Sequence, residues 1–280
     1  MVKFYNSQSN TLLFVESGIT NDTSAPWTPP ADGLYRVELY AIRDDLSSWQ
    51  RYKHNFSVGD GPELDPYGDL VISLLRLNGS LEDETGRAWQ QTRGTIDFHA
   101  SGGPFGGSYA RFEGAAFWSP DGLSLGPDEP LTVEAFVRVV SSAPGAGTQC
   151  IFALRKSSNE RVSFYHALGG TEFRIYQRPA APPDVPADRT IISIEFPSDE
   201  WIHVAYVRDM NGHRLYFSGV QVGESMQPLN GFEDVFLYLG QSGNNTEFLT
   251  GDLAELRVTK GMGRYIGNFS PPSGPFPVIG

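Results

Sequence analysis

The feature that most limits how this chain can fold is the alternation of apolar and polar residues along many short segments. In residues 131–140, Leu131, Val133 and Val137 fall on one side of an extended chain, whereas Thr132 and Glu134 fall on the other. A two-residue period is that of a β-strand with one face on a core. We find no window of about eleven residues that repeats apolar residues with the period of a helix. The chain is therefore predicted to be all-β.

Twelve strands are expected in the larger part of the chain. The 31 Gly and 20 Pro residues separate these segments at short intervals, which is typical of a sandwich or barrel. The clearest hairpin turn is Asn211-Gly212. The expected strands cover residues 70–77, 95–99, 108–113, 131–140, 149–155, 161–167, 172–178, 190–196, 200–208, 213–219, 235–240 and 252–258.

Residues 1–62 are expected to form a separate small β-module, for which an Ig-like arrangement is one option. Four candidate strands surround a Pro-Trp-Thr-Pro-Pro segment, and the Gly-, Pro- and Asp-rich residues 59–68 are predicted to be a linker. The larger domain then covers residues 63–280, with the Pro-rich residues 180–188 as a long loop. A module of this size buries a small core, yet it is rich in aromatic residues. Two explanations stay open: burial against a partner chain in a homo-oligomer, or packing onto its own larger domain.

The charge and the ends of the chain limit the partners that we expect. The formal net charge is −12, from 33 acidic and 21 basic residues, which argues against nucleic acid and anionic lipid because both need clustered Lys and Arg. The first residues lack the apolar stretch of a secretion signal, and no apolar run reaches the length of a membrane span. We therefore expect synthesis in a cytoplasm without membrane insertion. The single cysteine, Cys150, is predicted to be a buried, inert thiol.

Six segments from Asp65 onward resemble, in the same order, those of laminin-G-like, concanavalin A-like domains that are common in bacteriophage virion proteins. The last segment is the most specific, because its pattern RVTKG…RY…NF.PP points towards the phage members. The segments are DPYGDLVISLLRLNG, LEDETG, FGGSYARFEG, LTVEAFVRV, WIHVAYVRDMNGHRLYFSGVQVGES and GDLAELRVTKGMGRYIGNFSPPSGPFP.

The resemblance implies a concanavalin A-like (laminin-G-like) jelly-roll sandwich preceded by the small β-module. It also implies a non-enzymatic structural protein of the virion, of tail, fibre or capsid-decoration type. Its sandwich would bind host-surface glycans or neighbouring virion proteins. The homo-oligomer is expected from the aromatic residues of the N-terminal module, not from the resemblance. Two alternatives are a free lectin-like carbohydrate-binding module and a glycoside hydrolase. The hydrolase is disfavoured because no strand carries the closely spaced carboxylate pair that such enzymes use.

Candidate site residues come from two sources. The resemblance implies a calcium site at Asp83 and Asp252, although Asn78 and Ser218 stand where the family has Asp, which lowers the ligand charge. No other cofactor is expected. Trp89, Tyr176 and Phe232 lie near predicted strand ends or loops and are candidate rings for stacking on a sugar. Trp118 and Trp201 lie in strand-like runs and are expected in the core.

Overall fold

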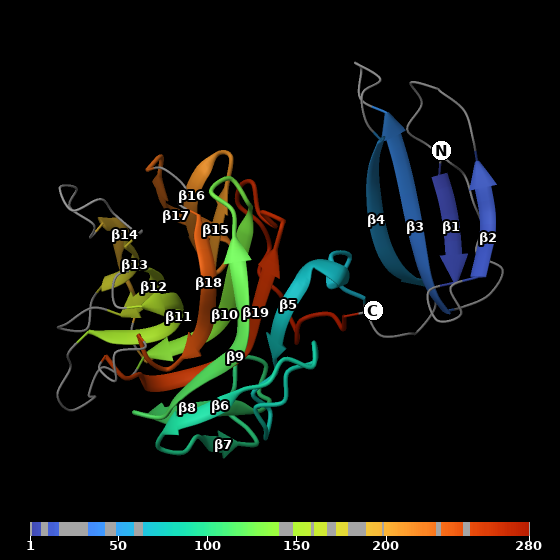
Figure 1. Ribbon diagram of the computed structural model, residues 1–280. Helices are drawn as coiled ribbons and strands as arrows, with labels where there is room; N and C mark the ends of the chain where they lie inside the picture. The colour runs from blue at the N-terminus through green and yellow to red at the C-terminus, as the bar shows by residue number, and fades with distance from the viewer. Residues whose placement is uncertain are drawn as a thin grey trace. The chain divides into compact units, whose positions relative to one another are not determined.

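A computed structural model of the chain divides into two compact units, Met1–Val71 with Phe276–Gly280, and Ile72–Pro275 (Figure 1). The sequence-based boundary between residues 62 and 63 lies before this division. Among the described residues, every regular element except the 3-10 turn Gly68–Leu70 is a strand, and no helix has the length and hydrophobicity to cross a membrane. The structure describes residues 2–6, 11–16, 33–42, 49–58, 64–139, 148–157, 160–166, 172–178, 189–197, 199–227, 231–242 and 247–279. The predicted loop 180–188 lies outside them.

The first unit contains one antiparallel sheet in the order β2-β1-β3-β4. Its strands are β1 (Val2–Asn6), β2 (Thr11–Glu16), β3 (Gly33–Ile42) and β4 (Trp49–Val58). The second half of the predicted linker, from Leu64 onward, is packed against other residues of this unit. Leu64 and Asp65 are buried, Leu64 bridges Val278, and the Asp65 amide donates to the Val278 carbonyl.

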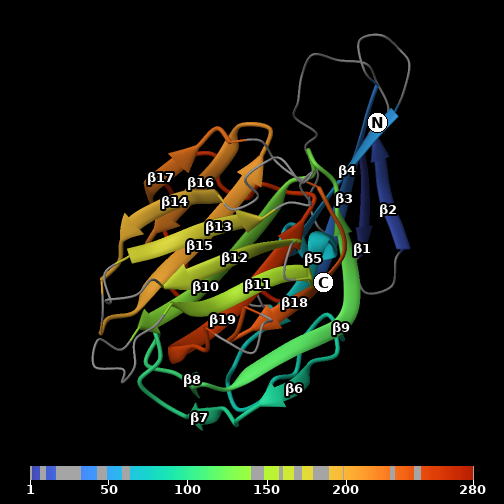
Figure 2. The same cartoon turned by 60° about the vertical axis from the view of Figure 1, so that its left-hand side comes forward.

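The second unit is a sandwich of two sheets whose neighbouring strands run antiparallel along both paths. Figure 2 shows the two layers, with β11–β14 lying over β10 and β15. One sheet has the order β17-β16-β15-β10-β19-β8-β7, with β5 paired to β19, and the other has the order β14-β13-β12-β11-β18-β9-β6. We call them the eight-stranded and the seven-stranded sheet. This is the predicted jelly-roll sandwich.

The eight-stranded sheet consists of β5 (Val71–Leu75), β7 (Asp97–His99), β8 (Tyr109–Glu113), β10 (Leu131–Val139), β15 (Ile202–Asp209), β16 (Gly212–Phe217), β17 (Val220–Ser225) and β19 (Thr250–Lys260). The seven-stranded sheet consists of β6 (Gln90–Arg93), β9 (Ala116–Leu125), β11 (Gln149–Ser157), β12 (Glu160–His166), β13 (Glu172–Arg178), β14 (Arg189–Glu195) and β18 (Phe232–Leu239). The predicted Asn211-Gly212 turn joins β15 to β16.

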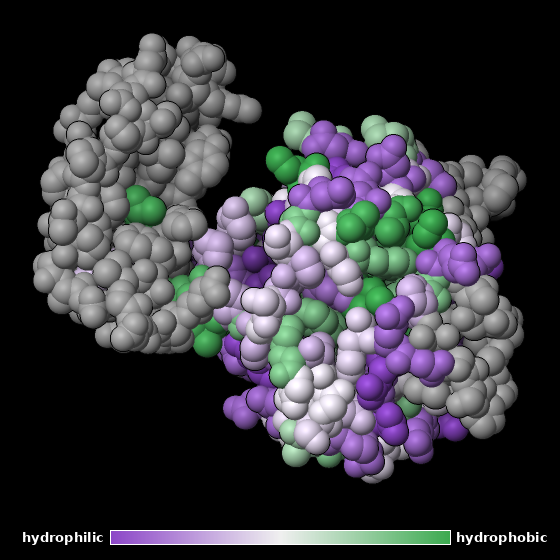
Figure 3. Space-filling view, turned by 180° about the vertical axis from the view of Figure 1, so that it is seen from behind, coloured by the Kyte–Doolittle hydropathy of each residue, from purple (hydrophilic) through white to green (hydrophobic). Residues whose placement is uncertain are grey.

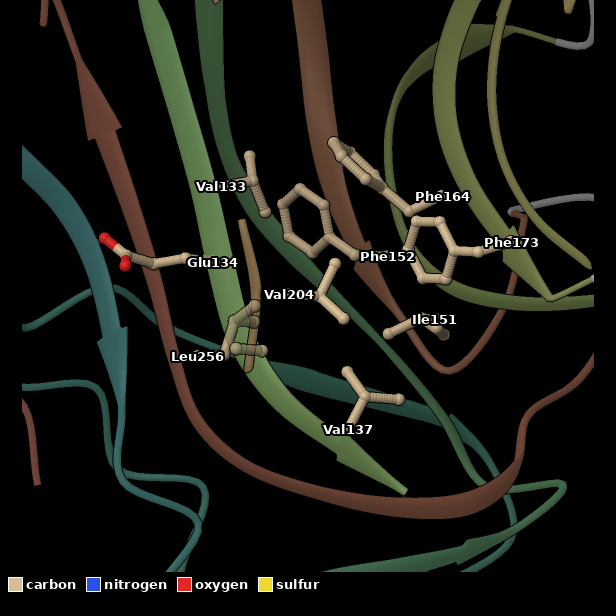
Figure 4. A pocket seen from close by; sticks show the side chains of 10 residues that line it. Val133, Glu134, Val137, Ile151, Phe152, Phe164, Phe173, Val204 and Leu256 are labelled. Atoms are coloured by element: carbon tan, nitrogen blue, oxygen red, sulfur yellow. The ribbon is translucent and has the colours of Figure 1, made fainter. Parts of the chain in front are cut away.

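The core lies between the sheets and is apolar. The alternating residues of β10, including Val133 and Val137, meet Phe152 and Phe164 from the seven-stranded sheet. They leave a cavity of about 20 Å³, which is room for roughly one water molecule. Figure 4 shows these side chains converging while the Glu134 carboxylate points away from them.

The other face of β10 is also buried, which the sequence does not predict. Thr132, Glu134 and Phe136 are 0%, 1% and 6% exposed, although a half-buried strand would expose them. Residues 261–275, which we call the C-terminal strap, cross the outer face of the eight-stranded sheet and cover Thr132 and Glu134. The ring of Phe105 packs on Phe136. This strap is the segment that carries the most specific part of the phage-type pattern.

Two stacked rings and a close backbone contact hold the strap to the sheet. Tyr265 and Phe269 are parallel, with centroids 3.6 Å apart, and they pack on Ala205 and Tyr216. The Phe269 amide donates to the Gly219 carbonyl at 2.9 Å. Gly219 has φ +80° in the turn between β16 and β17. A Cβ added there would lie 1.9 Å from the Phe269 carbonyl oxygen, so only glycine allows this approach.

We expect Gly219→Ala to lower the free energy of unfolding by at least about 2 kcal/mol, because a left-handed backbone strains a Cβ and the strap must also move. Gly267→Ala is the matched control within the strap, since nothing lies within 4 Å of its added Cβ. Urea denaturation of both variants measures the difference. Equal stability of the two variants would show that this contact does not hold the strap.

Candidate ligand-binding face

The outer face of the seven-stranded sheet carries half-exposed aromatic side chains. On β18, Val235, Leu237 and Leu239 enter the core, so the intervening Phe236 and Tyr238 point outward. On β9, Phe117 is likewise buried in the core, which turns its neighbour outward. That neighbour is Trp118, which lies 5.4 Å from Phe236 and 6.3 Å from Tyr238 between ring centroids.

Trp118 and Tyr238 belong to one row that runs across the strands. Cross-strand pairing sets Trp118 opposite Tyr238, Tyr238 opposite Ala153, Ala153 opposite Ser163, and Ser163 opposite Tyr176. The row thus crosses β9, β18, β11, β12 and β13. We call Trp118, Tyr176, Phe236 and Tyr238 the aromatic platform.

Small residues at the middle of the row let the rings lie down on the sheet. Cys150 and Ala153 are fully buried, and Tyr176 and Tyr238 pack on them. Cys150 is a free, buried cysteine, as the sequence predicts. Trp118 and Tyr238 are inclined by only 24°. Phe236, by contrast, meets Trp118 edge-on at 73°, so the rings gather on one face of the sheet without forming a single plane.

The polar groups near the platform are largely buried, and Tyr238 is the half-exposed one. Arg155 is 4% exposed and donates to the Ser242 carbonyl oxygen at 2.6 Å. Burial raises the pKa of Tyr238, although the charge of Arg155 opposes that shift, so the phenol is protonated at neutral pH and can donate. Ser163 Oγ and Ser242 Oγ are buried and have no hydrogen-bond partner among the described residues.

The predicted sugar-stacking rings fall in three different environments. Tyr176 belongs to the platform. Trp89 is half-buried against the core, and its indole nitrogen donates to Asp83 at 3.0 Å. Phe232 is 1% exposed and has no face for a ligand, so this part of the prediction is wrong. It fails because the strand begins at this residue and turns the ring into the core.

The sequence missed most of the platform. Trp118 was expected in the core but is half-exposed on the outer face, and Phe236 and Tyr238 were not singled out. A usable signal was present, since residues 235–239 alternate aliphatic with aromatic residues. A strand with apolar residues on both faces is usually buried on both faces. The pattern of residues 235–239 therefore does not predict an exposed aromatic face. Trp201 is half-buried and packs against Arg138.

The calcium prediction is not supported by the positions of its two carboxylates. Asp83 accepts from Ser73 Oγ, the Leu74 amide, the Thr85 amide and hydroxyl, and the Trp89 indole. Asp252 is fully buried and pairs with Arg111 and Arg138. Both carboxylates are thus saturated by protein donors, which leaves no lone pairs directed at a cation. No cluster of three or more His, Cys, Asp or Glu side chains suited to a metal occurs in the described part of the chain.

Among the described residues, Glu134 is a buried carboxylate that lies beside a buried histidine. Its Oε1 accepts from Arg257 at 2.8 Å, and its Oε2 lies 2.7 Å from the Tyr265 hydroxyl and 3.2 Å from His203 Nε2. Burial alone raises the pKa of the Glu134 carboxyl, but Arg257, His203 and Arg264 together hold it well below its ordinary range. The side chain is 1% exposed. Glu134 is therefore an ionised anchor for the strap and not a general acid.

The sequence family agrees with this architecture. Residues 111–262, more than half of the chain, match a laminin-G-type model described as the concanavalin A-like lectin/glucanases superfamily. The chain belongs to this superfamily. Among curated proteins, no sequence matches it significantly.

Solved structures show the same fold at low sequence identity. The botulinum neurotoxin serotype G binding domain aligns with a TM-score of 0.52 and 13% identity, over 70% of this chain and 48% of its own. The binding domain of Paraclostridial Mosquitocidal Protein 1 aligns with a TM-score of 0.51 and 11% identity, over 69% of this chain and 49% of its own. A third structure is Domain 4 of AbnA, a GH43 extracellular arabinanase from Geobacillus stearothermophilus, in complex with arabinotriose. It aligns with a TM-score of 0.49 and 19% identity, over 68% of this chain and 92% of its own. This chain therefore spans about half the length of the two toxin binding domains.

We expect Glu134→Gln to lower the free energy of unfolding at pH 7 by about 3–5 kcal/mol, because it leaves buried cations without their counter-charge. A carboxylate with a depressed folded pKa stabilises the fold above its unfolded pKa of about 4.3 and loses that contribution as the pH falls. The difference in the free energy of unfolding between wild type and variant should therefore become smaller below about pH 4.3. Urea denaturation across pH measures it, with the exposed Glu82→Gln as control. A gap that stays constant with pH would contradict the anchoring role.

Proposed function

We propose that this protein is a non-enzymatic structural component of a bacteriophage virion, of tail, fibre or capsid-decoration type. Its platform would contact host-surface glycans or neighbouring virion proteins. The observation that carries the proposal is the aromatic platform, a group of half-exposed rings on the outer face of the seven-stranded sheet. Aromatic residues dominate the energetics of binding surfaces because they bury much area at little cost in side-chain entropy.

The chemistry of the platform supports binding rather than catalysis. Retaining glycoside hydrolysis needs two carboxyl groups about 5–5.5 Å apart on the substrate face. In the row from Trp118 to Tyr176, the intervening residues are Tyr238, Ala153 and Ser163, and none has a carboxyl group. The buried Glu134 belongs to the other sheet and is covered by the strap.

The virion assignment is supported by the strap. Its residues carry the pattern that resembles phage laminin-G-like proteins, and Arg257, Tyr265 and Phe269 of that pattern have defined packing roles. The net charge of −12 agrees with an exposed protein that has no nucleic-acid partner. The alternative is a free lectin-like module. Such a module would not copurify with virus particles, whereas a virion component would.

We expect Trp118→Ala to weaken binding to whole host cells about two- to tenfold, because one aromatic contact contributes about 0.5–1.5 kcal/mol. Ile266→Ala, which truncates a side chain that is 86% exposed on the strap, should bind as the wild type does. Flow cytometry of labelled protein measures the binding, and mass spectrometry of purified particles tests virion membership. Unchanged binding by Trp118→Ala would show that the platform is not the contact surface, and absence from particles would favour the free module.

We also propose that residues 1–62 anchor the protein in a homo-oligomer and display the sandwich. The chain without residues 1–62 should remain folded and monomeric but should not join the particle, because the sandwich has its own core. Light scattering and particle cosedimentation measure the two properties. Normal assembly of the shortened chain would remove the anchoring role.

A further inference from the structure

We infer that Asn78-Gly79 is a site of spontaneous covalent modification, at which the asparagine deamidates through a cyclic imide to aspartate and isoaspartate. The inference is independent of the proposed function. The sequence contains three Asn-Gly pairs, at Asn78, Asn211 and Asn230, and the dipeptide alone does not distinguish them. Asn230 lies outside the described residues. The other two differ in how freely their reacting groups can move.

The reaction joins two neighbouring groups and consumes one water molecule. The backbone nitrogen of Gly79, on losing its proton, forms a bond to Cγ of Asn78, and the C–N bond of the side-chain amide breaks. The leaving nitrogen takes up a proton and departs as ammonia, so that a cyclic imide remains. Water then opens either carbonyl of the ring and gives aspartate or isoaspartate. A glycine favours this attack because it has no side chain to hinder its nitrogen and its backbone adopts many conformations.

Both reacting groups are free at Asn78-Gly79. Asn78, Gly79 and Ser80 are exposed, so water reaches the pair. Gly79 has φ +127°, and a Cβ added to it would meet no atom within 4 Å, so the backbone has room to turn. Among the described residues, no hydrogen bond holds the Asn78 side chain or the Gly79 amide. The Gly79 nitrogen can therefore approach Cγ of Asn78 without breaking a hydrogen bond.

The same dipeptide is held in place at Asn211-Gly212. The Asn211 amide donates to Asp209 Oδ1 at 2.8 Å. Gly212 is buried and pairs with Asp209 across the hairpin of β15 and β16. A Cβ added to Gly212 would lie 2.5 Å from the Ser225 carbonyl oxygen, so β17 confines the backbone at this point. Attack by the Gly212 nitrogen on Asn211 would therefore require the turn to open.

The cost of opening that turn sets the difference in rate between the two sites. A hydrogen bond to a charged group, such as that from the Asn211 amide to Asp209, lowers a rate by at least about tenfold when it must be broken first. We therefore expect Asn78 to deamidate at least about tenfold faster than Asn211 in the folded chain. Conversion of Asn78 replaces a neutral amide by a carboxylate, so the formal net charge changes from −12 to −13.

The residues on either side confine the change to one loop. Leu77, directly before Asn78, is fully buried with φ +57°, and Asp83 is buried and forms a bridge with Leu75. Isoaspartate carries the main chain through its side-chain carbonyl and so lengthens the segment between Leu77 and Asp83. The modified protein should therefore keep its sandwich and differ in the length and charge of this loop.

The test incubates the full chain at mildly alkaline pH, where a backbone amide loses its proton more readily, and follows its tryptic peptides by mass spectrometry. Residues 77–87 contain Asn78 and residues 209–214 contain Asn211. Each peptide gains the mass difference between OH and NH2 on conversion, and chromatography separates the aspartate and isoaspartate forms. We expect residues 77–87 to convert at least about tenfold faster than residues 209–214. In urea, where the turn at Asn211 is lost, the two rates should approach each other.

Two variants complete the test, and thermal unfolding checks that each is folded. Asn78→Gln should leave residues 77–87 unmodified over the same period, because a larger ring closes more slowly. Ser80→Ala is the matched control and should convert as the wild type does, since it keeps Asn78-Gly79. Equal rates for the two peptides in the folded chain, or faster conversion of residues 209–214, would overturn the inference. A difference in rate that persists unchanged in urea would also overturn it, because the cause would then not be the fold.

Discussion

The buried carboxylate of Glu134 is the interaction on which the outer layer of the eight-stranded sheet depends. It neutralises Arg257 from β19 and receives the Tyr265 hydroxyl from the strap, so it joins two adjacent strands to the segment that covers them. A buried charge without such partners would cost several kcal/mol. With them, the polar side of β10 becomes part of the interior. The strap then brings Phe269 against Gly219, where the absence of a Cβ allows the backbones to meet.

This arrangement makes the two outer faces of the sandwich different. The strap covers the eight-stranded sheet, and its charged groups are largely paired, as in the bridges from Asp252 to Arg111 and Arg138. On the seven-stranded sheet the rings of the platform stay half-exposed over a floor of small residues. Exposed apolar side chains elsewhere include Met210 and Ile266. Figure 3 shows one face of the sandwich where hydrophobic residues lie in patches among hydrophilic ones. The platform differs because pairing across the strands aligns its members.

Much of the fold could be predicted, but less of the site. The alternation in residues 131–140 and the Asn211-Gly212 turn located strands and a hairpin, because both are local properties of the backbone. Tyr176 was the one candidate ring that lies on the platform. Trp118 was assigned to the core, since aromatic residues in a strand are usually buried. The resemblance implies calcium at Asp83 and Asp252, but protein donors occupy both carboxylates. Those of Asp252, Arg111 and Arg138, are more than 100 residues away in the chain, so no local pattern shows them.

The sequence alone determined the all-β class, the sandwich and the superfamily. Strand periodicity, turn residues and the family pattern are each properties of short segments of the chain. It also determined that Glu134 shares a strand with an apolar face. Only the tertiary structure decided that Glu134 is buried, that the strap closes one sheet, and that Trp118, Tyr238 and Tyr176 form one surface. These outcomes depend on which strands become neighbours and in what register. Side chains that are about 60 residues or more apart in the chain are brought together by that register, and no local pattern encodes it.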